Sequence, residues 1–354
     1  MVPNSVKKLV ELGFDVMVET GLGIASGLPD EDYEAAGADV VRDMASAQLS
    51  SEVVLRVRKP PEEDLEFLAE DALHISFLDP FNDKPLVGKL AVRGVTAVSM
   101  EMVPRTTRAQ KMDALSSQAN LAGYVTVILA AAHSPKIFPM MMTPAGTISP
   151  ARVFVIGAGV AGLQAIATAK RLGARVEAFD TRPVVAEQVQ SLGGRFVEID
   201  IGDTGQTEQG YARSLTEEQL ELQRQGMKRV IVYSDVVITT AQVFGRPAPR
   251  IVTRDMVAAM RPGSVVVDMA VESGGNVEGS VLDQIVEVGG VKVIGLGNLP
   301  SEVARNASEM YSSNVTHFLD EFYDSENKRF DLDPDDEILV GCVLTRSGKV
   351  VNRR

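Results

Sequence analysis

A glycine-rich turn between an expected strand and an expected helix constrains the fold of this chain more than any other feature. The turn reads Gly157-Ala158-Gly159-Val160-Ala161-Gly162, after an apolar run at 153–156 and before a helical pattern at 163–172. In that setting, the first glycine permits a tight turn, the second lets the backbone approach a pyrophosphate, and the third allows close packing of helix on strand. The motif therefore predicts a dinucleotide site at a helix N-terminus.

The next expected strand, at 174–179, ends in a carboxylate, Asp180. A carboxylate there accepts hydrogen bonds from ribose hydroxyls and repels a 2′-phosphate, so NAD is favoured over NADP. Thr181 and Arg182 follow, and the Arg182 guanidinium offers the opposite possibility, a pair with a phosphate. A turn that only needs positive φ, with Asp180 as a helix cap, is the purely structural interpretation.

Strand-length apolar runs alternate with helical patterns along most of the chain, which is typical of the α/β class. We expect two Rossmann-like doubly wound domains joined by long helices: residues 1–123, completed by 303–354, and residues 124–302, which would bind NAD(H). The expected strands of the first sheet are 14–19, 53–57, 73–78 and 95–100, and those of the second are 152–156, 174–179, 236–239, 264–268 and 291–295.

The first domain is expected to begin with a helix, since Pro3-Asn4-Ser5 forms a cap signal before an apolar pattern at 6–12. A doubly wound domain normally starts with a strand. Either this domain lacks its leading strand, or the natural start lies upstream. Further helices are expected at 109–132 and 301–322, and strand-like pieces around Val340 and Val350 are expected to return to the first domain.

Composition excludes several classes of protein. The 354 residues carry a net charge of −13, which disfavours nucleic acid and anionic lipid as partners. A single cysteine, Cys342, rules out an internal disulfide, and three separated histidines give no metal motif. No uninterrupted apolar run approaches the roughly 18 residues of a membrane helix. We therefore expect a cytoplasmic protein with no metal and no direct membrane insertion.

Several segments carry a family resemblance over essentially the whole chain. The chain closely resembles domain I, the NAD(H)-binding part of the alpha subunit, of the proton-translocating NAD(P) transhydrogenases. Only the opening strand of that family and its loop have no counterpart here. The segments are 104–113, 140–146, 163–174, 210–212, 238–241, 261–264, 268–276 and 341–343.

The resemblance implies a homodimeric NAD(H)-binding subunit that works with separate partner subunits. One partner would hold NADP(H) and accept the hydride of NADH. Another would span the inner membrane and couple hydride transfer to proton translocation, so that this chain would be cytoplasmic and peripheral to the membrane.

The resemblance also implies the roles of several residues. Arg105 and Ser116 would hold the nicotinamide carboxamide, and Gln110 with Asp113, three apart on one expected helical face, the nicotinamide ribose. A polar helical turn with an exposed ion pair is the structural interpretation of this segment. Tyr211 would lie in a lid at 200–215. The remaining expected contacts with the cofactor follow the second sheet, at Thr240, Ala241, Gly275 and Asn276.

Two other functions are open. Alanine dehydrogenases resemble the chain too, but use a histidine at a strand end as catalytic acid; His74 lies five residues too early for that place. Hydride transfer between nicotinamides moves no proton, so it needs no such acid. The other possibility is a binding module that responds to NAD(H) without catalysis.

Overall fold

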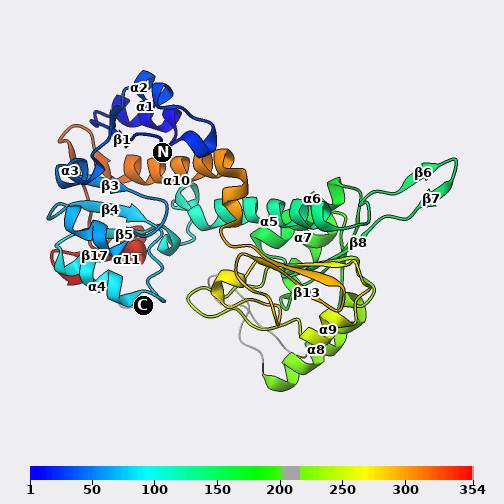
Figure 1. Cartoon of the computed structure of the whole chain (residues 1–354). Helices are drawn as coiled ribbons and strands as arrows, with labels where there is room; N and C mark the ends of the chain where they lie inside the picture. Colours follow the sequence, from blue (N-terminus) through cyan, green and yellow to red (C-terminus); the bar gives the residue numbers. More distant parts are fainter. Residues whose placement is uncertain (201, 203–215, 353–354) are drawn as a thin grey trace. The chain divides into compact units, whose positions relative to one another are not determined.

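The computed structural model describes residues 1–200, 202 and 216–352 (Figure 1). The chain divides into two compact units, of which the first joins Met1–Gln118 with Ala304–Arg354 and the second is Ala119–Val303. The expected boundary, after residue 123, lies five residues further along the same helix.

The second unit is built on a seven-stranded sheet with the order β10-β9-β8-β11-β12-β14-β13. All neighbours are parallel except β13, which runs antiparallel to β14. From β8 the chain winds outward through β9 to one edge, then returns to β11 on the other side. The strands are β8 (Arg152–Ile156), β9 (Arg175–Phe179), β10 (Arg195–Phe196), β11 (Val236–Thr239), β12 (Val265–Asp268), β13 (Gln284–Val288) and β14 (Val291–Gly295).

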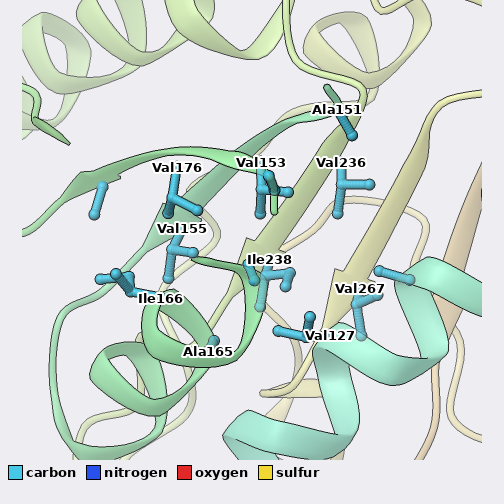
Figure 2. Close-up of a cluster of buried hydrophobic side chains, with 14 of the residues drawn as sticks. Val127, Ala151, Val153, Val155, Ala165, Ile166, Val176, Val236, Ile238 and Val267 are labelled. Atoms are coloured by element: carbon cyan, nitrogen blue, oxygen red, sulfur yellow. The ribbon is translucent and has the colours of Figure 1, made fainter. Parts of the chain in front are cut away.

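Helices cover both faces of this sheet, as the α/β pattern requires (Figure 1). On one face, Val127 and Ile166 pack beneath Val155 and Ile238 in an apolar core (Figure 2). Met227 and Met256 pack against the other face. The helices are α5 (Ala114–His133), α6 (Val160–Arg171) and α7 (Ala186–Ser191) on the first face and α8 (Glu217–Ile231) and α9 (Arg254–Ala258) on the second.

The expected α/β class is confirmed, and all five strands predicted for the second sheet are present. The sequence prediction missed the two edge strands. β10 has only two residues, and β13 is mostly exposed, so neither shows a continuous apolar run. A hairpin of β6 (Met141–Thr143) and β7 (Gly146–Ile148), also unpredicted, projects from the second unit (Figure 1).

The first unit carries a five-stranded sheet with the order β18-β17-β5-β4-β3. The prediction of one sheet from four strands was wrong, because β1 pairs with the unpredicted β2 in a separate parallel pair. Each of these two strands has only three residues, too few for a clear pattern. The strands are β1 (Met17–Glu19), β2 (Asp39–Val41), β3 (Val53–Leu55), β4 (Leu73–Ser76), β5 (Thr96–Ser99), β17 (Val343–Arg346) and β18 (Lys349–Val350), with a further pair β15 (Tyr323–Asp324) and β16 (Arg329–Phe330).

Helical boundaries in the first unit correct three predictions. The first helix begins at Pro3 with Val2 as its N-cap, because proline suits the first turn and the cap signal lies inside the helix. Val340 belongs to a helix, and the chain returns to β5 only through β17. The third, a helix beginning at residue 109, is described with the site. The helices are α1 (Pro3–Glu11), α2 (Asp30–Ala35), α3 (Met44–Leu49), α4 (Lys84–Val92), α10 (Ala304–Phe322) and α11 (Glu337–Cys342).

Helix α5 is long and apolar enough, by length and composition alone, to cross a membrane. The prediction considered only uninterrupted apolar runs, whereas this helix mixes apolar with small and polar residues. Core helices have the same composition, and Val127 and Ala130 of α5 are fully buried in the second unit.

Gly123 of α5 allows a close backbone contact within the second unit. A Cβ atom at this position would lie 2.2 Å from the backbone oxygen of Ala161, in the first turn of α6. We expect Gly123→Ala to lower the free energy of unfolding of the second unit by about 1–3 kcal/mol, because α5 and α6 would have to separate. Urea denaturation followed by circular dichroism measures the effect.

Gly88→Ala is the matched control, because a Cβ atom at this helical glycine would meet no atom of the described residues within 4 Å. Helix propensity alone should make that variant more stable by up to about 1 kcal/mol. Equal stability of the two variants would contradict the proposed close contact.

Candidate functional site

The glycine turn lies at the carboxyl end of β8, beside the point where the strand order reverses. Ligands of open α/β sheets bind in the crevice at such a reversal. Gly157 has a φ of +97°, and a Cβ atom there would lie 2.6 Å from Thr240 Oγ1. At Gly162 a Cβ atom would lie 1.9 Å from the Gly157 oxygen. The turn therefore excludes side chains at both positions.

The amino end of helix α6 is open to a ligand. Gly159 is its N-cap and provides no side-chain acceptor for the first backbone N–H groups. A Cβ atom at Gly159 would meet none of the described residues within 4 Å, so they leave space beside the turn. Val160 is 37% exposed, while Ala158 and Ala161 are buried. N–H groups without intrahelical acceptors and the helix dipole suit this end to bind a phosphate.

Asp180 lies at the carboxyl end of β9 and is buried. Its Oδ2 accepts a 2.8 Å hydrogen bond from the backbone N–H of Ala158, which ties it to the glycine turn. The guanidinium of Arg182 donates to both carboxylate oxygens. Thr181, between them in the chain, is partly buried. The structure thus brings Asp180 to the turn, as a ribose acceptor requires, but already hydrogen-bonded.

Two further strands are hydrogen-bonded to the turn at the same sheet edge. Thr240, after β11, donates through Oγ1 to the Gly157 oxygen at 3.1 Å. The amide of Asn276 accepts from Ala241 N–H and donates to Ala241 O and Pro249 O. Because this side chain is buried and fully engaged with backbone, Asn276 holds the loop rather than presenting its amide to a ligand.

Asp268, at the end of β12, organises the loop that contains Asn276. Its fully buried carboxylate accepts from the backbone N–H groups of Ala270, Asn276 and Val277. Gly275 has a φ of +82°, and a Cβ atom there would lie 2.7 Å from Asp268 Oδ2. The sequence prediction missed Asp268, although a carboxylate that directly ends an apolar strand was a signal for such a role.

The four predicted nicotinamide-positioning residues lie in the first unit, before and at the start of α5. Asp113 accepts from Ser116 N–H at 2.8 Å and from Ser116 Oγ at 2.5 Å, so it caps the helix. Arg105 Nε lies 3.9 Å from Asp113 Oδ2. The structure brings these three side chains together on one segment.

Gln110 differs from the prediction. It lies in a 3-10 turn (Gln110–Met112), and α5 begins only at Ala114, so Gln110 and Asp113 do not share a face of one α-helix. Two residues missed from sequence hold this segment. Asn314 donates to the Lys111 oxygen, and Arg108 bonds Glu321 and Asp336, each at 2.6 Å.

Two other predicted features differ in what the structure shows. Tyr211 and most of its segment lie outside the described residues. His74 is fully buried in β4, with Nε2 3.0 Å from Ser76 Oγ. Burial, together with the charge of Arg56, lowers the pKa of His74 to about 3. His74 is thus a neutral core residue near physiological pH.

Comparison with known proteins identifies the family. The family model described as "Alanine dehydrogenase/PNT, N-terminal domain" matches residues 1–122, and its C-terminal counterpart matches residues 126–353. The first of the separate polypeptides that form the NAD(P) transhydrogenase alpha subunit of Rhodospirillum rubrum is 44% identical, over 99% of this chain and 93% of the relative. An alanine dehydrogenase of Halomonas elongata is 29% identical, over 90% of this chain and 82% of that protein.

Solved structures agree with the sequence comparisons. The transhydrogenase from Sinorhizobium meliloti superposes with a TM-score of 0.85 at 44% identity, over 99% of this chain and 94% of that structure. The chain therefore belongs to the alanine dehydrogenase/PNT family, and it is more similar to these transhydrogenases than to the alanine dehydrogenase of Halomonas elongata.

Proposed function

We propose that this chain is the NAD(H)-binding subunit of a proton-translocating transhydrogenase. The observation that carries the proposal is the open N-terminus of α6, next to Asp180, at the reversal of strand order. NADH, when bound, would supply the hydride that NADP⁺ on a partner subunit accepts.

The residues at the carboxyl edge fit a dinucleotide. The N–H groups at 158–162 would bind the pyrophosphate without any side-chain cation. Asp180 would accept from the adenosine ribose, and the backbone around Ala241 and Gly275 would border the cofactor further along the edge. Tyr211 would close over the nucleotide as part of a lid.

The first-unit residues would hold the nicotinamide end. Arg105 and Ser116 would bind the carboxamide, and Gln110 with Asp113 the ribose. Direct hydride transfer depends on placing two rings with their reacting carbons roughly 3–3.5 Å apart and on excluding water. Positioning, rather than acid or base catalysis, is thus the task of these side chains, and Asp113 fixes the rotamers of its neighbours.

The partners follow from the names of the relatives. The Rhodospirillum relative is named as one portion of an alpha subunit, which implies further subunits. We propose a homodimer that works with an NADP(H)-binding subunit and a membrane-spanning subunit, on the cytoplasmic side of the inner membrane. The spanning subunit would couple hydride transfer to proton translocation.

The second candidate, an alanine dehydrogenase, is favoured by the fold: an L-alanine dehydrogenase superposes with a TM-score of 0.81 at 26% identity. It is disfavoured by His74, which is buried and neutral. An assay with separate arms decides between them. We expect hydride exchange from NADH only in the presence of NADP⁺ and the partner subunits, and no oxidation of L-alanine with NAD⁺.

Turnover of L-alanine without partners would contradict the transhydrogenase assignment. NADH binding without exchange, in the presence of active partners, would identify a binding module instead.

Asp180→Ala tests the carboxyl edge. Loss of charge-assisted hydrogen bonds to the ribose should weaken NADH binding by roughly 1.5–3 kcal/mol, measured by isothermal titration calorimetry. Glu177→Ala on the same strand is the control, since Glu177 pairs with Arg195 at the exposed end of the sheet. An affinity equal to that of the unmodified protein would remove Asp180 from the site.

Asp113→Asn tests the positioning role in the first unit. An amide cannot accept from both Ser116 donors and pair with Arg105 as the carboxylate does, so the nicotinamide end would lose its fixed partners. We expect hydride exchange to slow by roughly tenfold or more, with NADH affinity changed by less than about threefold. Lys111→Gln, an exposed neighbour, is the control. Equal rates for both variants would refute the role of Asp113.

A further inference from the structure

The side chain of Arg182 is committed to Asp180 within the second unit. Arg182 Nε lies 2.9 Å from Oδ1 and Nη2 lies 2.9 Å from Oδ2, which makes the pair bidentate. The backbone N–H of Arg182 also donates to Oδ1 at 2.9 Å. The side chains are only 16% and 7% exposed. This pairing raises the pKa of Arg182 above its ordinary value, so the guanidinium is permanently charged.

The same carboxylate is fixed from the opposite side by the glycine turn. Ala158 N–H donates to Oδ2 at 2.8 Å, so Asp180 cannot follow Arg182 away from the sheet edge. Four donors therefore converge on one buried carboxylate. A planar guanidinium held in this way is oriented by geometry as well as charge, and a bidentate pair is the strongest arrangement that Arg and Asp can form.

We infer that Arg182 is a specificity-determining residue, and that Asp180 excludes NADP(H) mainly by sequestering this cation. The inference rests on the proposed function, since it concerns the ribose end of the same site. A 2′-phosphate would need a guanidinium for charge compensation, and the one that follows β9 is bound to Asp180. In the simpler account, the negative charge of Asp180 alone repels the phosphate.

The two accounts differ because the pair as a whole is neutral. A neutral Asp180–Arg182 pair repels a phosphate less than a lone carboxylate would. Under the simple account, removal of the carboxylate suffices to admit NADPH, whatever residue stands at position 182. Under sequestration, the gain requires both removal of the carboxylate and the presence of the arginine.

Three variants separate the accounts: Asp180→Asn, Arg182→Gln and the double variant. NADPH and NADH affinities are measured by nucleotide fluorescence on the full chain, with 2′,5′-ADP against 5′-AMP as competitors. For Asp180→Asn we expect NADPH to bind at least about tenfold more tightly than to the unmodified protein, because the released guanidinium can pair with the 2′-phosphate. The double variant should lose this gain, and Arg182→Gln should show none.

Equal NADPH affinity of Asp180→Asn and the double variant would overturn the inference in favour of charge repulsion alone. A gain of NADPH affinity in Arg182→Gln would also overturn it. Asp180→Ser provides the same test should the amide variant fail to fold. Failure of the unmodified protein to bind NADH would instead refute the proposed function, so the two failures are distinguishable.

Discussion

A chain of hydrogen bonds across the carboxyl edge of the second sheet is the interaction on which the site depends. Asp180 bonds the glycine turn through Ala158, Thr240 bonds it through Gly157, and Asn276 joins the loops after β11 and β12. These bonds connect the ends of four neighbouring strands. The polar groups at this edge satisfy one another, while the N-terminus of α6 is left without a side-chain cap. The edge is thus preorganised around an opening suited to an anion.

This preorganisation limits which side chains a ligand can use. Asn276 and Asp268 are engaged with backbone, and Asp180 is shared with Arg182. A nucleotide would therefore be bound mainly by backbone N–H groups and by one carboxylate whose other partner is a cation. The first unit follows the same rule, because the Asp113 oxygens that cap a helix also face Ser116 and Arg105. Asp113 and Asp180 each have a structural partner as well as a proposed ligand.

Burial decides between the two candidate chemistries at His74. A histidine in the middle of a sheet strand is desolvated, and the neighbouring charge of Arg56 disfavours its protonation further. Such a group carries no added proton at physiological pH. A reaction that moves only a hydride does not require one. A buried, neutral histidine is therefore compatible with the proposed transhydrogenase role, and not with an amino-acid dehydrogenase that uses this residue as its acid.

The sequence by itself determined the α/β class, the five central strands of the second sheet and the glycine turn, because long apolar runs and glycine spacing are local signals. Only the tertiary structure decided the separate β1–β2 pair, the edge strands β10 and β13, the 3-10 turn at Gln110, and the pairing of Asp180 with Arg182. Short or exposed strands carry too few apolar residues to be recognised. The partner of a polar side chain depends on which chain segments fold together, which the spacing of residues along one strand does not specify.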